Sequence, residues 1–378
     1  MTEKSRGLGW LSWLVAVVAI ALAVFLFVQN RNLRDQVDDL DLADQSATVE
    51  AAMSSEARQE DAGRTTKDTV LSRGKLILGA NAALPGFGAL NASTGTYAGF
   101  DVDFGKAVAA ALDVEMEVVP LTAGERFTAL QTRQVDVLIR NTTWTVTRDS
   151  QDVGANFGPT TFYDGQGFIV RKSDNIQSIR DLDGATVCVT SGTTTEGNLA
   201  DAFRLNGLTL STQVFAETEA AFGAYDAGAC DCYTSDKSQL ASLRTTAANP
   251  EDHAILPDTI SKEPLGPLTR HGDDEWFDVV KWVVFATFFA EEHGITQANV
   301  DTFTSENPEV RRFLGLEGGM GAKLGLAEDW AVNVIRAVGN YGEIYNRHLG
   351  ASGLDIPRAG SLNDLWINGG LIYCPAWR

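Results

Sequence analysis

Basic residues are scarce in this sequence. Its 378 residues include 30 Lys and Arg against 50 Asp and Glu, which gives a formal net charge of −20 and a pI near 4.6. A nucleic-acid partner needs Lys and Arg gathered on one face to contact the phosphates. The sequence therefore argues against nucleic-acid binding, whereas a small ligand stays compatible with an acidic surface.

Metal-binding spacings are also missing. Only four histidines occur, scattered along the chain, and no C-x2-C or H-x3-H pattern accompanies the "CDC" at residues 230–232. The P-loop spacing G-x4-G-K-[ST] is absent as well. We therefore expect neither a metal site nor a cofactor.

One long apolar run is present, "LSWLVAVVAIALAVFLFV" at residues 11–28. Eighteen helical residues rise about 27 Å, close to one hydrocarbon thickness. No good A-x-A cleavage site follows the run, so we favour an uncleaved signal anchor at residues 1–30, with a cleaved signal peptide as the alternative. Lys4 and Arg6 place the N-terminus in the cytoplasm, although Arg31 and Arg34 weaken that asymmetry.

Beyond this anchor the pattern changes twice. Residues 31–69 are polar and read as a spacer helix or solvated linker. From about residue 70, strands alternate with helices, which predicts parallel sheets in α/β domains. The expected strands are 75–81, 116–121, 135–139, 185–191, 211–215 and 230–235; the expected helices are 101–113 (capped by Asp101 or Asp103), 124–134, 195–207 (closed by Gly207), 218–228 and 273–294. The pattern restarts near residue 185, which indicates two lobes.

Three polar segments follow expected strands, at residues 79–88, 140–148 and 190–198. Ligands of open parallel sheets bind beyond the carboxyl ends of the strands. In "RNTTWTVTR" (140–148), Arg148 is suited to a bidentate contact with a carboxylate; alternatively it is a surface arginine paired with Asp149 or Asp152. The role of Trp144 stays open.

Lobe 2 offers two further candidates. "SGTTTE" (191–196) joins a strand to a helix, where Gly192 permits a tight turn and the following threonines surround free N–H groups. The alternative is an ordinary N-cap. Asp236, which follows the strand of "CDCYTS", is suited to an ammonium group, with a helix cap as its alternative.

The chain from residue 70 resembles the family 3 bacterial extracellular solute-binding proteins of ABC transporters, and in particular the general L-amino-acid subgroup. The resemblance rests on "GFDVDFGKAVAAAL" (99–112), "TWTVTRD" (143–149), "FYDGQGFIV" (162–170), "GTTTE" (192–196), "YTSDKSQL" (233–240), "ISKEPLGPLTRHGDDEWFDVVKW" (260–282) and "NGGLIYCPAW" (368–377). It implies an α/β periplasmic-binding-protein-like fold of type II topology, in which two hinge crossings near residues 164–170 and 261–266 join two lobes. Lobe 1 would span residues 70–167 and 263–378, including a C-terminal extension, and lobe 2 residues 168–262.

The resemblance also implies roles for individual residues. The α-carboxylate of the ligand would meet Arg148, Asn141 and Thr143 from one lobe and Thr193 and Thr194 from the other. Asp236 would bind the α-ammonium, and Phe87 or Leu84 would cover the ligand's side chain. Asn81 stands where some family members have an acidic residue for the ammonium, a departure that bears on amine recognition and ligand preference.

The implied function is that of an extracytoplasmic, membrane-anchored substrate-binding component in the periplasm. It would capture a free L-amino acid by closing its cleft and then dock on the permease of an ABC transporter. A dehydratase-like enzyme on the same fold and a membrane-anchored sensor are the alternatives. No Glu or His is clearly placed as a catalytic acid or base, so we expect no enzyme and no catalytic residue.

An even number of cysteines suits an exported chain with disulfides. Cys188 and Cys230 belong to neighbouring strands of lobe 2, which brings them within reach of each other. We expect the pairs Cys188–Cys230 and Cys232–Cys374.

Overall fold

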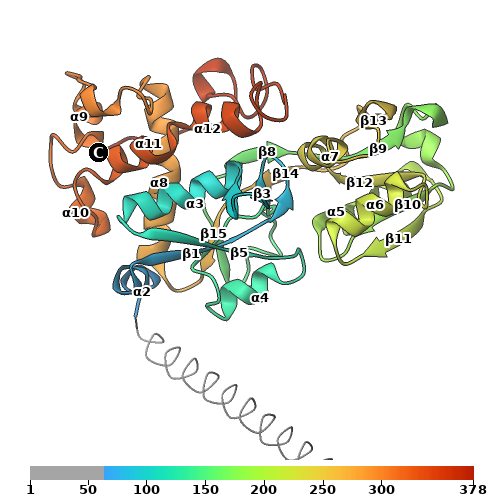
Figure 1. The fold of residues 1–378 in the computed structure, drawn as a ribbon, viewed down its shortest axis with the longest axis horizontal. Coiled ribbons are helices and arrows are strands. Elements are labelled where there is room, and N and C mark those ends of the chain that lie inside the picture. Colours follow the sequence, from blue (N-terminus) through green and yellow to red (C-terminus); the bar gives the residue numbers. More distant parts are fainter. Residues whose placement is uncertain (1–63) are drawn as a thin grey trace, which may run out of the picture. The chain divides into compact units, whose positions relative to one another are not determined.

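The computed structural model describes residues 64–378. Figure 1 shows two α/β lobes, each built on its own five-stranded sheet. We call the lobe that contains the first strand lobe 1 and the other lobe 2. The predicted anchor at residues 1–30 and most of the predicted spacer lie outside the described residues. Within residues 64–378, no helix is long and apolar enough to cross a membrane.

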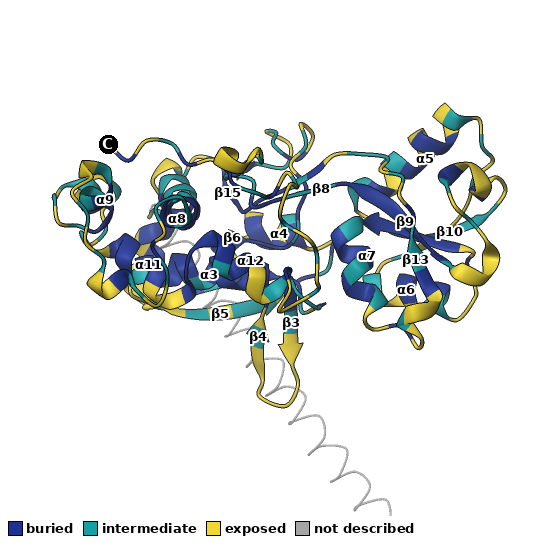
Figure 2. Cartoon of the chain, turned by 90° about the horizontal axis from the view of Figure 1, so that it is seen from above, coloured by how far each residue is buried: buried dark blue, intermediate teal, exposed yellow. Residues whose placement is uncertain are grey.

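Lobe 1 has the strand order β5-β1-β6-β15-β7. β1 lies parallel to β5 and β6, whereas β15 runs antiparallel to β6 and β7, so the sheet is mixed rather than wholly parallel. Its strands are β1 (Lys75–Ala80), β5 (Glu115–Pro120), β6 (Val137–Leu138), β7 (Ala155–Phe157) and β15 (Leu268–Arg270). A small antiparallel sheet adds β2 (Ala83–Leu84), β3 (Gly88–Asn91) and β4 (Thr96–Ala98), whose β3–β4 hairpin is largely exposed in Figure 2.

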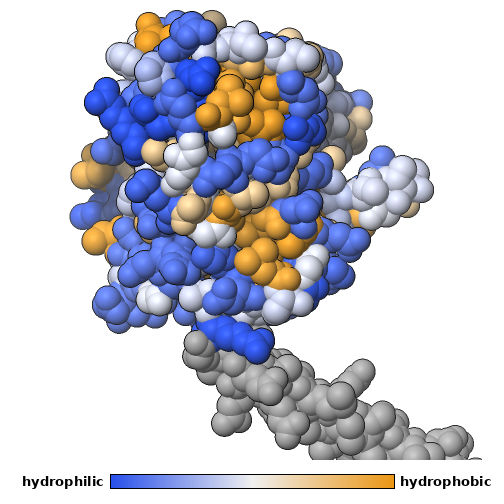
Figure 3. Space-filling model, turned by 90° about the vertical axis from the view of Figure 1, so that its left-hand side faces the viewer, coloured by the Kyte–Doolittle hydropathy of each residue, from blue (hydrophilic) through white to orange (hydrophobic). Residues whose placement is uncertain are grey.

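The described helices of lobe 1 come from both parts of its chain. They are α2 (Thr66–Arg73), α3 (Phe100–Ala111), α4 (Arg126–Gln131), α8 (Asp274–Glu292), α9 (Pro308–Phe313), α10 (Met320–Leu324), α11 (Trp330–Val338) and α12 (Tyr341–His348). The apolar faces of α3, α8, α11 and α12 bury a continuous core, visible as the dark blue surfaces of Figure 2. Figure 3 looks at the end formed by the C-terminal helices, where hydrophobic patches lie among hydrophilic side chains.

Lobe 2 has the strand order β11-β10-β12-β9-β13. β10 is parallel to β11 and β12, while β9 runs antiparallel to β12 and β13. Its strands are β9 (Gln166–Arg171), β10 (Thr186–Thr190), β11 (Ser211–Phe215), β12 (Cys232–Asp236) and β13 (His253–Ile255), and its described helices are α5 (Thr194–Asn206), α6 (Thr218–Asp226) and α7 (Lys237–Arg244). Gly207, at φ 69°, ends α5 as predicted.

Two short strands connect the lobes. β8 (Phe162–Asp164) precedes the first strand of lobe 2, and β14 (Glu263–Leu265) follows the last one. The two pair antiparallel, with Glu263 opposite Asp164 and Leu265 opposite Phe162. The chain therefore crosses between the lobes twice, through neighbouring segments.

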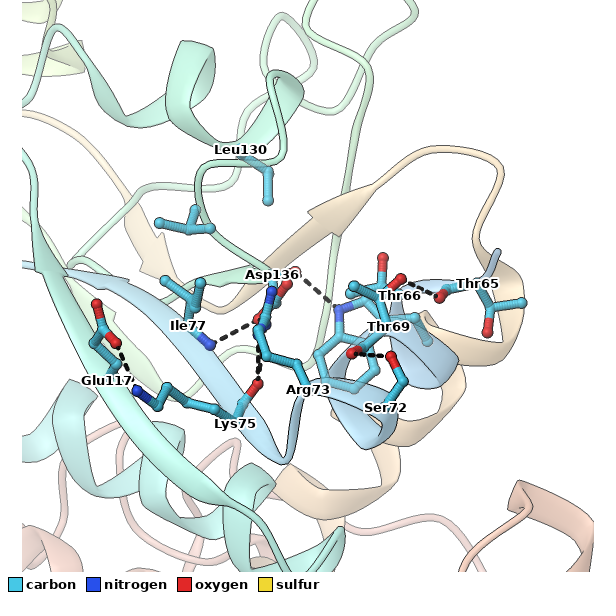
Figure 4. Close-up of polar contacts among 12 residues, drawn as sticks. Thr65, Thr66, Thr69, Ser72, Arg73, Lys75, Ile77, Glu117, Leu130 and Asp136 are labelled. Atoms are coloured by element: carbon cyan, nitrogen blue, oxygen red, sulfur yellow. Dashed lines mark hydrogen bonds and ion pairs between the residues drawn. The ribbon is translucent and has the colours of Figure 1, made fainter. Parts of the chain in front are cut away.

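The start of the described chain is tied to the sheet of lobe 1 through Asp136. Its carboxylate accepts a hydrogen bond from the Ile77 N–H (2.7 Å) and pairs with Arg73 of α2, as Figure 4 shows. Its carbonyl accepts a hydrogen bond from Trp276 Nε1 (2.9 Å) in α8. One buried residue thus joins α2, β1 and α8.

The aspartates at the start of α3 do not cap it. The helix begins at Phe100 with Gly99 as its N-cap, so Asp101 and Asp103 lie in the first turn. Asp103 instead pairs with Lys106 (2.8 Å), His348 (2.7 Å) and Arg347 (2.5 Å). Burial alone would raise the pKa of Asp103, but the bonds from His348 and Lys106 outweigh burial and lower it to about 2. The carboxylate therefore links α3 to α12.

One predicted disulfide is confirmed and the other is wrong. Cys188 and Cys230 are bonded, with Cα atoms 5.7 Å apart. Cys232 and Cys374 are both free and buried. Cys232 packs in a core cluster of lobe 2 on the other face of the sheet from Cys188, whereas Cys374 packs in the lobe 1 core. The two free thiols belong to different lobes, so the expected bond cannot form.

Candidate functional site

The segment 140–148 enters a pocket between the lobes. Arg148 is only 8% exposed, and its Nη1 donates to the Thr143 carbonyl at 3.1 Å. Among the described residues it pairs with neither Asp149 nor Asp152, so the surface-arginine interpretation is wrong. Burial lowers the pKa of Arg148, while Glu263 and Asp236 oppose that shift. The loop thus holds a buried cation toward the other lobe.

Trp144 supports this loop from outside the pocket. Its ring stacks on Phe157 with centroids 5.7 Å apart, and its Nε1 donates to Asp149 at 2.9 Å. The side chain is 41% exposed and does not line the pocket. This contact also explains why Asp149 is not the partner of Arg148.

Lobe 2 presents threonines at the start of α5. Gly192 has φ 70°, a left-handed conformation that provides the predicted tight turn. Thr193 donates to the Thr190 carbonyl (2.6 Å), and its side chain makes no capping bond to the helix. Thr194 donates to Glu263 (2.9 Å) and lies 3.5 Å from the Thr143 hydroxyl of lobe 1. The N-terminal turn of this 13-residue helix therefore faces lobe 1 with hydroxyl groups around it.

Asp236 is a buried carboxylate without a hydrogen-bond partner in the described chain. It is 5% exposed and occupies the N-cap position of α7, yet its side chain makes no capping bond. Burial raises its pKa well above the usual range; the nearby acids Asp164 and Glu263 raise it further, while Arg148 and Arg126 oppose them. The helix-cap alternative is therefore wrong, and the carboxylate is available to a cationic group.

Six of the nine predicted ligand residues come together around one pocket: Asn141, Thr143, Arg148, Thr193, Thr194 and Asp236. The pocket has a volume of about 20 Å³, and residues of both lobes line it. Its other lining residues are Ala123, Arg126, Arg140, Thr195, Thr218, Ser235 and Gln239. We call it the charged pocket, because buried cations and a buried carboxylate share its small volume.

Arg126 and Arg140 also line the pocket, although neither was predicted from the sequence as a ligand residue. Arg126 is 3% exposed; its Nη2 donates to the Gly192 carbonyl of lobe 2 (3.3 Å), and its Nε is buried without a partner in the described chain. Burial lowers its pKa well below the usual value, and the neighbouring cations Arg148 and Arg140 lower it further. Arg140 begins the polar segment 140–148, so the rule that directed attention to Arg148 covers it too, whereas Arg126 is the first residue of α4.

Asn141 links the two sides of the pocket. Its backbone N–H donates to Asp101 at 2.6 Å, and its Nδ2 donates to Gln239 Oε1 of lobe 2 at 3.0 Å. Its φ of 33° is positive, a conformation that needs support in a residue with a side chain. Burial raises the pKa of Asp101 to about 7, while the bond from Asn141 and the charge of Arg140 oppose that shift. Asp101 thus holds Asn141 in place.

A second cavity, of about 150 Å³, adjoins the charged pocket. Ala123, Arg140 and Thr218 line both, and Asn81 lines only the second. Asn81 Nδ2 also donates to Asn141 Oδ1 at 3.4 Å. The structure thus places Asn81 beside the charged pocket rather than in it.

Leu84 and Phe87 have a different position. Each is 1% exposed in the core of lobe 1, and the Phe87 ring packs edge-on against Phe100 and Phe162. Neither lines the charged pocket or the adjoining cavity. The expectation that one of them covers a ligand's side chain is therefore not met in this arrangement, because their segment folds back onto the core.

The charged pocket matches a small ligand that carries both charges. Guanidinium groups and hydroxyls offer donors to an anion, and the carboxylate of Asp236, which makes no capping bond, offers an acceptor to a cation. A buried charge left without a partner costs several kcal/mol, so a bound ligand would have to neutralise both signs.

Comparison with known proteins places the chain in a family. The profile of the bacterial extracellular solute-binding proteins, family 3, matches residues 76–351. The general L-amino acid-binding periplasmic protein of Rhizobium johnstonii is 53% identical over 323 residues, which are 84% of this chain and 94% of that protein. The glutamate/glutamine/aspartate/asparagine-binding protein of Rhodobacter capsulatus is 50% identical over 322 residues, again 84% of this chain and 94% of the relative.

A solved structure shows the same fold. The ABC transporter periplasmic binding protein from Brucella ovis, determined with glutathione bound, superposes with a TM-score of 0.80 at 47% identity and covers 83% of this chain and 99% of its own. The two lobes and their two crossings are therefore those of a known binding-protein architecture. This chain belongs to the bacterial extracellular solute-binding proteins of family 3.

Proposed function

We propose that this chain is the extracytoplasmic substrate-binding component of an amino-acid ABC transporter. In this proposal, Arg148, Asn141, Thr143 and the first turn of α5 hold the α-carboxylate of a free L-amino acid, and Asp236 holds its α-ammonium. The observation that carries the proposal is that buried arginines and a buried carboxylate without a hydrogen-bond partner in the described chain line the same small pocket.

The relatives support this assignment. The named proteins of Rhizobium johnstonii and Rhodobacter capsulatus bind amino acids, and the Brucella ovis protein was solved with glutathione, which carries an amino-acid head group. No His or Glu lines the described pocket, and its one carboxyl group, Asp236, has the role of ammonium partner in this proposal, so we infer a binding protein rather than a dehydratase-like enzyme. A sensor role would require a separate output partner.

We also propose that the apolar run at residues 11–28 anchors the protein to the cytoplasmic membrane and places residues 31–378 in the periplasm, where the permease would be its partner. The disulfide Cys188–Cys230 supports an oxidising compartment. Extraction of membranes at alkaline pH tests the anchor: an anchored chain stays with the membrane pellet, and its release into the supernatant would contradict the proposal.

Calorimetric titration of the purified full-length chain with the twenty amino acids tests the binding function. We expect several L-amino acids to bind, and analogues that lack either the α-carboxylate or the α-amino group to bind at least about tenfold more weakly. Absence of binding to every amino acid, or equal binding of the analogues, would contradict the proposed function.

A further inference from the structure

We propose that a cavity in the C-terminal part of lobe 1 is a second ligand site, which takes a small aromatic carboxylate. Trp282, Trp330 and Trp377 hold the ring of this ligand, and Lys323 pairs with its carboxylate. The site goes beyond the proposed function, because the cavity shares no lining residue with the charged pocket or with the cavity beside it.

The cavity belongs to the C-terminal helices of lobe 1. Its lining residues come from α8, α10 and α11 and from Trp377 and Arg378. Figure 1 shows α10, α11 and the C-terminus gathered at the end of lobe 1 that is farther from lobe 2. The family profile matches the chain only as far as residue 351, so Trp377 and Arg378 lie beyond the matched part. The amino-acid site of the proposed function therefore does not account for this cavity.

Three indole rings give the cavity its aromatic lining. The Trp377 ring stacks on Trp330 with centroids 5.7 Å apart, and it meets the Trp282 ring edge-on at 5.4 Å. The Trp377 carbonyl accepts a hydrogen bond from Arg312 Nε at 3.0 Å, which holds the C-terminal segment in place. The cavity has a volume of about 110 Å³. Because an apolar protein cavity of about 150 Å³ binds benzene, a volume of this order suits a single ring rather than a fused one.

Trp377 also carries a polar group that lacks a partner. The residue is 3% exposed, and its Nε1 is buried without a hydrogen-bond partner within residues 64–378. By contrast, the buried Nε1 of Trp276 donates to the Asp136 carbonyl at 2.9 Å. A buried N–H without an acceptor is unfavourable, because it has lost water and gained nothing in exchange. A ligand oxygen in the cavity that Trp377 lines would supply the acceptor.

The charged groups that line the cavity are basic. They are Lys323 and Arg378, and no Asp or Glu is among its described lining residues. Arg378 donates through Nε to Glu309 at 3.0 Å, whereas the exposed Lys323 makes no ion pair or hydrogen bond within residues 64–378. Indole faces alone would also attract a cation, so Lys323 is the group that selects an anion. An aromatic ring with a carboxylate matches the rings, the lysine and the Trp377 donor together.

Three ring compounds of nearly the same shape test the charge preference. Benzoate is anionic, benzamide is neutral and benzamidinium is cationic, and acetate is an anion without a ring. Calorimetric titration of the purified full-length chain measures their Kd values. We expect benzoate to bind about threefold more tightly than benzamide and about tenfold more tightly than benzamidinium, and acetate not to bind. Equal affinities of the three ring compounds, or no binding of benzoate, would overturn the proposal.

Two variants locate the binding. Lys323→Gln should weaken benzoate binding about threefold, to the level of benzamide, and leave benzamide binding unchanged. Lys172→Gln removes an exposed lysine of lobe 2 and is the matched control, which should change neither. Met320→Trp puts a larger side chain into the cavity lining and should abolish benzoate binding, while alanine binding stays as in the wild type.

The indole N–H of Trp377 reports direct contact with the ligand. Its NMR resonance, assigned by its loss in Trp377→Phe, should shift when benzoate is added and stay in place when acetate is added. If that resonance stays in place while benzoate binds, or if Arg148→Gln abolishes benzoate binding and Met320→Trp does not, the second site is wrong and the proposed function stands. A wild-type chain that binds benzoate in this way but binds no amino acid would support the second site and contradict the proposed function.

Discussion

The two lobes contribute opposite charges to the same pocket. Lobe 1 supplies the guanidinium groups of Arg126, Arg140 and Arg148, whereas lobe 2 supplies the carboxylate of Asp236 with the hydroxyls of α5. Each lobe alone would leave one end of a zwitterion unmatched. Under the proposed function, closure around a ligand would therefore be electrostatic as well as steric, because only the pocket formed by both lobes would neutralise both ends.

The lobes also differ in how they are held together. Lobe 1 has a large core, with an aromatic cluster around Trp377 in which Phe289 and Phe313 each lie 5.1 Å away between ring centroids, and an ion-pair network around Asp103. Lobe 2 has fewer buried apolar side chains, and the Cys188–Cys230 disulfide crosslinks it. A smaller core buries less apolar surface, so a covalent link contributes relatively more to its stability.

Removing the disulfide should have the largest effect and should fall on lobe 2. For a crosslink that spans 42 residues, the chain-entropy argument gives a loss of about 4 kcal/mol in the free energy of unfolding for Cys188→Ala with Cys230→Ala. Tryptophans of the described chain lie only in lobe 1, so denaturant unfolding followed by both fluorescence and circular dichroism separates the lobes. Cys232→Ala is the control, at about 1 kcal/mol. Equal losses for the two variants would show that the bond does not stabilise lobe 2.

Neutralising Asp236 should weaken ligand binding and at the same time stabilise the free protein. Asp236→Asn removes the proposed partner of the α-ammonium, so we expect the affinity for alanine to fall about 100-fold. It also removes an unpaired buried charge near Asp164 and Glu263, so the melting temperature of the free protein should rise. Calorimetric titration and thermal unfolding measure the two effects.

The pH dependence provides a second readout of Asp236. Because its pKa is raised, protonation begins at a higher pH than for an ordinary Asp, and alanine binding by the wild type should weaken as the pH falls. The affinity of Asp236→Asn should not follow that change. Asp201→Asn, an exposed position of lobe 2, is the control and should behave as wild type. A variant that binds alanine normally would show that the carboxylate has no role in amine recognition.

Acid should destabilise lobe 1 more than lobe 2, because lobe 1 contains the ion pairs of Asp103. Its folded pKa of about 2 lies below the ordinary 3.8, so its ion pairs stabilise the fold above about pH 4, and this contribution is lost as the pH falls toward 2. The shift corresponds to about 2 kcal/mol at most. Urea unfolding followed by tryptophan fluorescence should show this loss in the wild type and a smaller one in Asp103→Asn. Parallel pH curves for the two would contradict the assignment.

Arg148→Lys should have the smallest effect of these changes, because it keeps the charge. Lysine cannot reproduce the two-pronged geometry of a guanidinium, so we expect alanine affinity to fall at least about tenfold. The exposed Arg336→Lys in lobe 1 is the control and should leave the affinity unchanged. An unchanged affinity in Arg148→Lys would mean that the arginine supports the loop through Thr143 and does not bind the ligand.

Much of the fold could be predicted because local pattern and global fold agree here. The strand at 75–81, the helix at 195–207 and the helix at 273–294 appear as β1, α5 and α8 with ends shifted by a residue or two. The rule that ligands bind beyond carboxyl strand ends then selected loops that the structure brings together, including Arg148 and Asp236. The alternation of strands and helices was less informative about strand direction, since β9 and β15 run antiparallel to their neighbours.

The errors arise where long-range packing decides. Nothing local shows that Phe87 turns onto Phe100 and Phe162 instead of toward the cavity. The pairing of Cys232 with Cys374 required knowing which lobe each cysteine enters and which face of β12 Cys232 occupies. Glu217 and Glu219 lie at the start of α6, and only the approach of the two lobes brings them to the same cavity as Arg140.

The paired crossings β8 and β14 have a mechanical consequence. Two antiparallel strands joined by hydrogen bonds form a ribbon, which resists stretching and shear along its length but bends and twists with little resistance. Glu263, within that ribbon, also accepts hydrogen bonds from Thr194 (2.9 Å) and Asn198 (2.7 Å) of lobe 2. Relative motion of the lobes should therefore reduce to bending and twisting of this ribbon, so distances measured between two differently placed pairs of labels would report it.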